Sequence, residues 1–282
     1  MNSRAYAKRF LPGFGSRLVV RRIVNLPRDV FESVTGRRDS LIPPHGLWFV
    51  GGEQDYQAVN EEYMRYFVDF AGLQPSHRVL DVGCGIGVMA ARLTKFLDAE
   101  GSYSGFDIVH VGVNWAQKHI GSRFPNFSFV HADIYNKHYN PKGKLSPDSF
   151  RFPYEDASFD FVFLKSVFTH LLPGVVAHYL REVRRVLKPT GCCLATAFLL
   201  GDESTKLIRE GRSSLSLLHD LDGCRVADPK FPESTVGIPE LLFQQCCDEA
   251  TMTILPPIRY GSWCGREEHI SYQDILILAP SA

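Results

Sequence analysis

The feature that most constrains the fold is a hydrophobic segment that leads directly into three alternating glycines. Residues Val79-Leu80-Asp81-Val82 are typical of a buried strand, Gly83, Gly85 and Gly87 follow at every second position, and a helical pattern begins at Val88. Such a strand, turn and helix N-terminus allow a ligand to lie against the backbone at the positive end of the helix. We therefore expect a bound cofactor here. A tight turn without a ligand is the alternative, but it requires fewer glycines.

Short β-branched or aromatic runs alternate with helical patterns from about residue 76 onward, which is typical of parallel βαβ units. We expect strands at residues 78–82, 102–108, 127–132, 159–164, 192–199, 252–259 and 272–279. We expect helices at residues 88–97, 113–120, 175–187 and 239–250, the third ended by Pro189 and Gly191. About a dozen residues separate the last two strands, too few for a usual helical crossover, so the final strand should run antiparallel.

Three regions lie outside this alternation and suggest the domain organisation. Residues 1–60 form a basic N-terminal arm with a possible lid around Phe49, Gly51 and Gly52. Residues 61–282 form the main domain, with insertions at 135–156 and 201–236.

The arm is strongly basic, with nine basic and three acidic residues among the first 40, although the whole chain has 31 of each. Because Pro12, Gly13 and Gly15 disfavour a helix, we expect a solvated, partly disordered arm. Contact with an anionic membrane surface is the alternative. The neutral net charge gives no reason to expect a nucleic-acid partner, and the oligomeric state is not predicted.

Composition narrows the class of protein further. With 45% hydrophobic and 22% charged residues, the chain resembles an ordinary globular domain, and no apolar run approaches the length of a transmembrane helix. Arg21 and Arg22 interrupt the apolar run that a cleaved signal would need. The seven cysteines include no CxxC, which argues against a disulfide framework and a zinc site. We expect a reducing, cytoplasmic location and no metal.

The residues themselves leave the identity of the cofactor open. A dinucleotide fingerprint G-x-G-x-x-G/A is present from Gly85 to Ala90, but it fails from Gly83 because Val88 occupies the sixth place. Asp107 ends the second strand about 20 residues on, where a carboxylate would accept hydrogen bonds from ribose hydroxyls. This arrangement suits NAD and an adenosyl cofactor alike.

The segment Val79 to Gly87 resembles the first motif of the class I S-adenosylmethionine-dependent methyltransferases. Asp107 and residues 131–134, 158–162 and 187–191 resemble that family's later landmarks at similar spacing, over roughly residues 60–282. Thr190 departs from the pattern, since many relatives have Gly there. Residues 36–52 further resemble the lead-in of an uncharacterised bacterial subgroup of small-molecule methyltransferases.

The resemblance implies an α/β, Rossmann-like fold. It would have a seven-stranded, mostly parallel sheet, helices on both faces and an antiparallel last strand. It implies methyl transfer from S-adenosylmethionine to an O, N or C atom of a small organic acceptor. An NAD(P)-dependent oxidoreductase and a non-catalytic cofactor-binding protein are the alternatives.

The same resemblance assigns the cofactor residues. Asp81 and the turn from Gly83 to Gly87 would hold the methionine part, Asp107 the ribose, and Asp133 with Ile134 the adenine. A helix cap is the alternative role for Asp133. The full set of expected cofactor residues is Asp81, Gly83, Cys84, Gly85, Gly87, Asp107, Ile108, Asp133, Ile134 and Lys165.

Candidates for chemistry and acceptor binding follow the fourth strand and open the loops at the same sheet edge. His170 is the best-placed general base, with a purely structural role as the alternative. Aromatic rings with polar tips suit an organic acceptor, although ordinary loop packing explains them equally well. The candidate acceptor residues are Tyr135, Tyr139, Ser166, Tyr260 and Trp263.

Substitution of the middle glycine tests the cofactor turn. Gly85→Val should block cofactor binding in a folded chain, because a branched side chain would occupy the space in which the cofactor approaches the backbone. Isothermal titration calorimetry measures the affinity, and an unchanged affinity in the folded variant would contradict the prediction.

Overall fold

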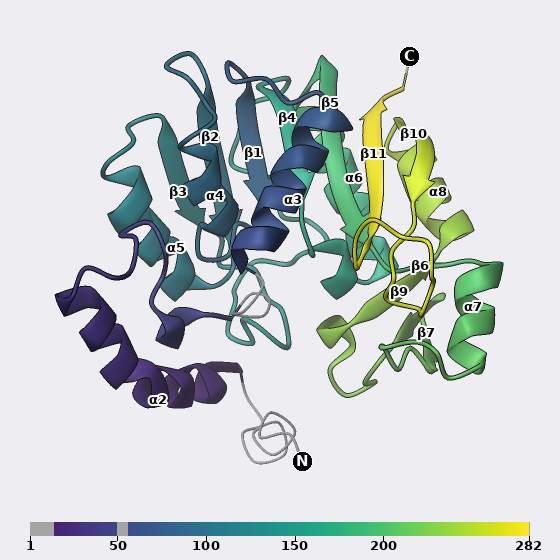
Figure 1. The fold of residues 1–282 in the computed structure, drawn as a ribbon. Coiled ribbons are helices and arrows are strands. Elements are labelled where there is room, and N and C mark those ends of the chain that lie inside the picture. The colour runs from purple at the N-terminus through teal and green to yellow at the C-terminus, as the bar shows by residue number, and fades with distance from the viewer. Residues whose placement is uncertain (1–13, 50–55, 282) are drawn as a thin grey trace.

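A seven-stranded sheet forms the centre of the computed structural model, which describes residues 14–49 and 56–281. The strand order is β10-β11-β5-β4-β1-β2-β3 (Figure 1). In chain order these strands are β1 (Arg78–Val82), β2 (Ser102–Asp107), β3 (Phe127–His131), β4 (Phe159–Leu164), β5 (Leu187–Ala197), β10 (Met252–Arg259) and β11 (Asp274–Pro280). Strands β1 to β5 pair in parallel, whereas β11 is antiparallel to both β5 and β10. The predicted mostly parallel sheet with an antiparallel last strand is therefore confirmed.

Helices cover both faces of this sheet. The helices around the sheet are α3 (Tyr56–Asp69), α4 (Val88–Leu93), α5 (His110–Ala116), the π-helical turn η2 (Gln117–Gly121), η3 (Phe168–His170), α6 (Pro173–Val186) and α8 (Glu240–Glu249). Alternate side chains of β4 enter different cores: Phe161 and Phe163 pack with α3, α4 and α5, whereas Val162 and Leu164 pack with α6 and α8. Apolar residues on both faces of a strand explain its continuous hydrophobic pattern.

The strand β5 begins earlier than the sequence predicts. Leu187 already pairs with Phe159, but the next pair is Phe161 with Cys192, so residues 188–191 form an irregular bulge. Pro189 lies in this bulge, where its missing N–H costs no regular ladder hydrogen bond. Pro189 and Gly191 therefore do not end α6, which stops before them at Val186.

The insertion at 201–236 has more secondary structure than its polar composition predicts. It contributes α7 (Asp202–Arg209), β7 (His219–Leu221), β8 (Cys224–Val226), η4 (Pro232–Ser234) and the start of β9 (Val236–Pro239). With β6 (Leu199–Leu200), these strands form a second sheet in the order β6-β9-β8-β7. Figure 1 shows this sheet beyond the carboxyl ends of the parallel strands.

The N-terminal region departs most from the prediction. Residues Phe14–Val34 form a helix, α2, of 21 residues that includes Pro27, and η1 (His45–Leu47) follows. The expectation of an arm without a helix was therefore wrong over these residues. Gly51 and Gly52 of the predicted lid lie outside the described residues, whereas Phe49 lies inside them. Among the described helices, none is both long and apolar enough to cross a bilayer.

Gly87 is expected to be required for packing. Its φ is +76°, and a Cβ there would lie 2.8 Å from Cβ of Ala116 on α5. Gly87→Ala should therefore lower the free energy of unfolding by roughly 2–4 kcal/mol, through left-handed strain plus overpacking.

Urea unfolding measures this loss of free energy. Gly211 supplies the matched control, since its φ is +71° but nothing lies within 4 Å of its added Cβ. Gly211→Ala should lose only the backbone part, roughly 1–2 kcal/mol. Equal losses in the two variants would show that contact with α5 does not constrain Gly87.

Candidate functional site

A cavity of about 650 Å³ lies at the carboxyl ends of β1, β2 and β4. This volume is within the range of roughly 300–1,000 Å³ that is usual for small-molecule sites. Seven of the expected cofactor residues line it, namely Asp81, Gly83, Cys84, Gly85, Asp107, Ile108 and Lys165. His170, Tyr139 and Ser166 line it as well. The structure thus brings most of the predicted site residues to one place.

The glycine turn borders this cavity with backbone rather than side chains. Gly83, Gly85 and Gly87 have φ values of +79°, +58° and +76°, in the left-handed region that favours glycine. Gly83 and Gly85 line the cavity, but Gly87 packs against α5 instead. A Cβ added at Gly83 would also lie 2.6 Å from Cγ2 of Val167, so close packing requires glycine at 83 as well as at 87.

Asp107 fixes the shape of the turn. Its Oδ2 accepts the N–H of Gly85 at 2.8 Å, and its Oδ1 accepts the N–H of Val109 at 2.7 Å. Burial raises the pKa of this carboxyl, although these two backbone hydrogen bonds oppose the rise. Each carboxylate oxygen can accept a further hydrogen bond, so ribose hydroxyls have acceptors at this position.

Two ionisable side chains, the buried Asp81 and the partly buried Lys165, also line the cavity. Asp81 accepts a hydrogen bond from the Tyr103 hydroxyl at 2.7 Å, and burial raises its pKa to about 7. Burial lowers the pKa of Lys165 to about 8, and the charge of Asp81 opposes that shift. Lys165 Nζ donates to Asn60 Oδ1 at 3.1 Å and lies 4.3 Å from the centre of the Tyr63 ring. The charge of this region therefore changes near neutral pH.

Ser166 has a strained backbone at the end of β4. Its φ is +60°, which is uncommon for a residue with a side chain. Thr196 Oγ1 accepts the Ser166 N–H at 2.8 Å, and Gln273 Oε1 accepts both the Ser166 hydroxyl at 3.0 Å and the Thr196 hydroxyl at 2.6 Å. This network holds the strained residue at the cavity wall.

His170 has a defined tautomer. Its Nδ1 lies 2.9 Å from the carbonyl oxygen of Glu233 in the second insertion, so Nδ1 carries the proton and donates it. Nε2 lies 3.5 Å from the hydroxyl of Tyr139 in the first insertion. Burial lowers the pKa of His170, which favours the neutral ring. Nε2 is then available as a proton acceptor beside the cavity.

The expected adenine residues do not line the cavity. Asp133 instead accepts a hydrogen bond from Asn140 Nδ2 at 3.2 Å, and Ile134 is buried in the core next to α6. Both hold the start of the first insertion. Ile108 and Val109, directly after β2, are the apolar residues that the cavity offers near Asp107.

Three of the expected acceptor residues also lie away from the cavity lining. Trp263 is fully buried and donates from Nε1 to Asp274 Oδ2 at 2.9 Å. Tyr260 donates to Glu240 at 2.8 Å, and Tyr135 is 43% exposed in the first insertion. Packing and local hydrogen bonds account for Trp263 and Tyr260.

Sequence reasoning missed cavity residues from two distant segments. Asn60 and Tyr63 come from α3, and Gln273 precedes β11. Asn60 is 1% exposed, and its Nδ2 has no hydrogen-bond partner within the part of the chain that the structure describes. A polar residue within the amphipathic pattern of α3 was the available signal, but it does not show which helix reaches the cavity.

The central part of the chain matches a known protein family. Residues 79–191 match the family model described as a methyltransferase domain. This segment spans the glycine turn, Asp107, Lys165 and His170. These residues therefore belong to a methyltransferase domain. A methyltransferase domain implies S-adenosylmethionine rather than NAD as the cofactor at the glycine turn.

Curated relatives share more than this segment. The chain is 31% identical over 202 residues to a sterol 24-C-methyltransferase of Schizosaccharomyces pombe, which covers 70% of the chain and 46% of that protein. It is 27% identical over 186 residues to the ubiquinone/menaquinone biosynthesis C-methyltransferase UbiE of Idiomarina loihiensis, covering 66% of the chain and 64% of that protein. The chain thus spans about half the length of the first of these relatives.

Solved structures share the fold at low identity. The PH0226 protein from Pyrococcus horikoshii OT3 matches with a TM-score of 0.57 and 18% identity, over 82% of this chain and 93% of that one. The 4+2 cyclase SpnF matches with a TM-score of 0.53 and 18% identity, over 94% and 97%. Likeness at this level shows the fold alone.

The cavity residues fit S-adenosylmethionine in chemistry. The side-chain-free backbone at Gly83 and Gly85 leaves room for the cofactor, and Asp107 offers acceptors for a ribose. When ionised, Asp81 would be an anionic partner for the positively charged methionine end. The match to a methyltransferase domain and the chemistry of the cavity residues therefore point to the same cofactor.

Cofactor affinity should depend on pH through Asp81. Because its pKa is raised to about 7, Asp81 is mostly neutral at pH 6 and mostly ionised at pH 8. The ionised carboxylate attracts the cationic cofactor, so affinity for S-adenosylmethionine should rise about tenfold between these pH values. Loss of the Lys165 charge near pH 8 acts in the same direction.

Calorimetry at pH 6, 7 and 8 measures this dependence in the wild type and in Asp81→Asn. The variant keeps an acceptor for Tyr103 but does not ionise at position 81, so its affinity should be weaker and should keep only the pH dependence that Lys165 contributes. A wild-type affinity that falls as pH rises would contradict the assigned role of Asp81.

Proposed function

We propose that this chain transfers the methyl group of S-adenosylmethionine to a carbon atom of a largely apolar small molecule. The observation that carries the proposal is a single cavity lined by two groups of residues from the methyltransferase domain. The glycine turn, Asp81 and Asp107 line it, and so do His170 and Tyr139.

Apolar lining supports an apolar acceptor. The side chains that line the cavity include Phe49, Val59, Val88, Met89, Phe106, Phe163, Val167 and Leu171. Such surfaces favour hydrocarbon or aromatic groups over charged ones. The relatives named above are C-methyltransferases of sterol and of ubiquinone or menaquinone biosynthesis, which supports the same class of acceptor and a carbon atom as the site of transfer.

The chemistry requires orientation more than covalent catalysis. When bound, S-adenosylmethionine supplies an electrophilic methyl group on a sulfonium. The protein must hold the acceptor carbon in line with that methyl and exclude water, a task for which the largely apolar lining of the cavity is suited. We propose that His170 Nε2 takes the proton that the acceptor carbon loses when its new bond forms, while Glu233 keeps Nδ1 protonated.

The remaining roles follow from position. We propose Gly83, Cys84, Gly85 and Ile108 as walls of the cofactor site, and Ser166 and Tyr139 as acceptor contacts. We also propose residues 61–282 as the catalytic unit and residues 1–60 as an accessory segment, whose last residue, Asn60, lines the cavity. The seven free thiols support a reducing, cytoplasmic location.

Shared fold does not decide the reaction, because a protein named as a cyclase has the same fold over nearly its whole length. The test is turnover. The chain is incubated with methyl-labelled S-adenosylmethionine and with a sterol, a quinol and a polar phenol, and the products are analysed by mass spectrometry and NMR. Carbon-bound label in an apolar product supports the proposal. Label only on oxygen or nitrogen of the polar acceptor, or no transfer to any of them, contradicts it.

His170→Ala separates base catalysis from positioning. If Nε2 accepts a proton, the variant should lose roughly 10²- to 10⁴-fold in kcat. Because burial lowers the pKa of His170 below its ordinary value, wild-type kcat should fall only in acid, below about pH 6.5, where the ring protonates. That acid limb should disappear in the variant, with cofactor affinity unchanged.

His178→Ala is the matched control. His178 is half-buried and lies 2.9 Å from a backbone carbonyl, that of Phe150, but it does not line the cavity. Loss of an imidazole-to-carbonyl hydrogen bond alone should therefore leave kcat and its pH profile unchanged. Near-normal turnover in folded His170→Ala would remove His170 from the mechanism.

A further inference from the structure

Helix α2 turns an apolar face to solvent. Eight of the sixteen exposed large apolar side chains of the described residues belong to this one helix. These are Val19, Val20, Ile23, Val24, Leu26, Val30, Phe31 and Val34, with exposed fractions between 40% and 81%. At 100° per residue they span an arc of about 160° that includes no charged residue. No residue of α2 is buried.

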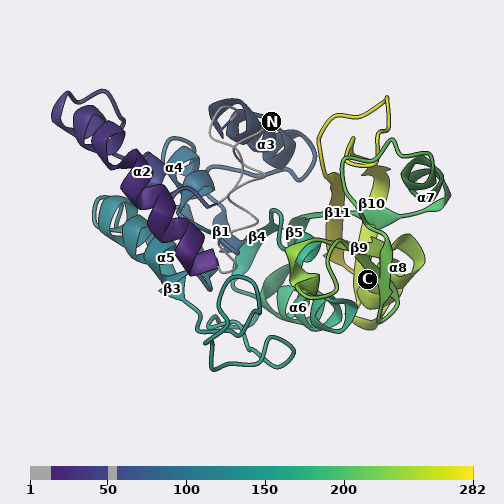
Figure 2. The same ribbon diagram turned by 90° about the horizontal axis from the view of Figure 1, so that it is seen from below.

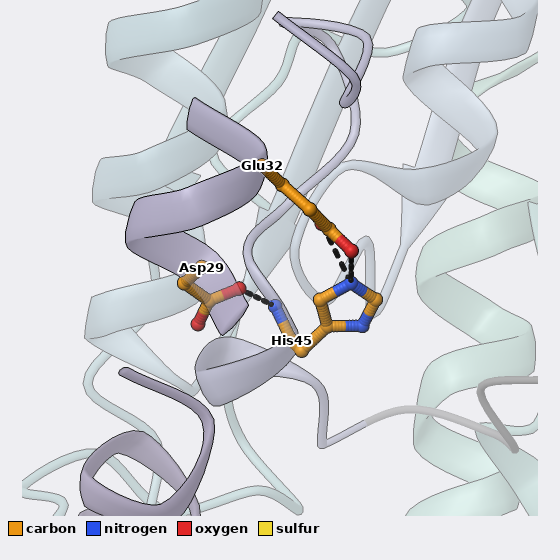
Figure 3. Close-up of side chains that lie close together, drawn as sticks. All are labelled: Asp29, Glu32 and His45. Atoms are coloured by element: carbon orange, nitrogen blue, oxygen red, sulfur yellow. Dashed lines mark hydrogen bonds and ion pairs between the residues drawn. The ribbon is translucent and has the colours of Figure 1, made fainter. Parts of the chain in front are cut away.

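The polar face of α2 points inward instead. Asp29 accepts the backbone N–H of His45 at 2.7 Å (Figure 3). It also accepts the backbone N–H of Gly46 at 2.9 Å and so caps the short helix η1. Glu32 contacts His45 Nε2 at 2.8 Å. Arg38 pairs with Asp29 at 3.1 Å. These bonds fix the rotation of α2 about its axis, so its apolar face has to point away from the molecule.

Asp29, Glu32 and His45 come close enough together to suggest a cation site. Guanidinium groups already supply the positive charge, however, because Arg28 lies 2.9 Å from Glu32 and Arg38 lies 3.1 Å from Asp29. Burial opposes ionisation of Glu32, but its hydrogen bonds from Arg28 and His45 prevail and lower its pKa. We interpret the cluster as the attachment of α2 and not as a metal site.

Positive charge borders the apolar face. Arg17 and Arg28 lie along one edge of the arc and Arg22 along the other, at 100° per residue. Both acidic residues of α2, Asp29 and Glu32, belong to the inward attachment. The outward side of the helix therefore combines aliphatic and aromatic surface with a cationic border, in which Arg28 also pairs with Glu32.

The helix also lies close to residues that line the cavity. Figures 1 and 2 show α2 at the end of the sheet where the parallel strands terminate. Its first residue, Phe14, packs edge-on against Phe49 at 5.6 Å and Tyr139 at 5.3 Å between ring centres. Both of these residues line the cavity. A surface that covers α2 would therefore lie next to the site.

We propose that α2 binds the surface of an anionic lipid bilayer, with its apolar face in the headgroup and acyl boundary and its arginines at the phosphates. An apolar face bordered by cations is the pattern of interfacial helices. A second copy of the chain fits less well, because a helix pair would bring the arginine edges together without outward carboxylates on α2 to neutralise them. The further suggestion that an apolar acceptor enters from the bilayer rests on the proposed methyl transfer; the binding itself does not.

Vesicle flotation of the full chain, without cofactor or acceptor, tests the proposal. The chain should float with vesicles of phosphatidylcholine containing phosphatidylglycerol, and should float at least tenfold less with pure phosphatidylcholine or in high salt. Ile23→Asp combined with Val30→Asp should lower the binding constant for the anionic vesicles at least tenfold, because both side chains lie near the centre of the apolar arc.

Leu241→Asp is the control, since Leu241 is 80% exposed on α8 and should leave vesicle binding unchanged. Circular dichroism confirms that each variant is folded. The proposal is overturned if the wild type does not float with the anionic vesicles, or if the double variant binds them as well as the wild type.

Sedimentation velocity tests whether a second copy of the chain covers the apolar face of α2 instead. A wild-type dimer that the double variant converts to monomer, without vesicle binding, would assign the α2 face to another copy of the chain. Because the flotation assay contains no S-adenosylmethionine, its failure leaves the methyl-transfer proposal untouched. Failure of methyl transfer likewise leaves the vesicle result standing.

Discussion

The carboxylate of Asp107 is the interaction on which the site depends. It connects the end of β2 to the glycine turn after β1 by accepting N–H groups from Gly85 and Val109. A turn of left-handed glycines has many accessible conformations when it is unfolded, so its ordering is costly. Buried hydrogen bonds to a carboxylate help to offset that cost and leave Gly83 and Gly85 facing the cavity. The sheet places these two loops side by side, and Asp107 fixes how they meet.

The sequence predicted this part of the molecule well because its signals are local. A strand pattern, alternating glycines and an acidic residue at the next strand end are short-range features, and the topology of parallel strands brings them to one edge. The bounds of β1, β4 and β10 agree residue for residue with the prediction. The site residues on α3 and before β11 were missed because only the tertiary packing of these segments brings them to the cavity. No local pattern at Asn60 or Gln273 indicates which surface they face.

The prediction for the N-terminal region was wrong for a different reason. Glycine and proline disfavour a helix locally, yet Phe14–Val34 is helical because tertiary bonds from Asp29 and Glu32 attach it to the segment around His45. Helices in proteins draw most of their stability from such contacts rather than from propensity. The amphipathic pattern of this helix also predicts the wrong orientation, since the apolar side of a helix is normally assigned to the core. Here the polar side makes the intramolecular contacts.

The proton position on His170 is set by a main-chain atom, the carbonyl of Glu233, and not by a carboxylate. A carbonyl cannot ionise, so the orientation of the ring does not vary with the charge of its partner. Any side chain at position 233 would present the same carbonyl, provided the second insertion keeps its path. The insertion can therefore diverge in its side chains while the imidazole keeps its tautomer. What the insertion has to conserve for this histidine is the path of its backbone and not the chemistry of its residues.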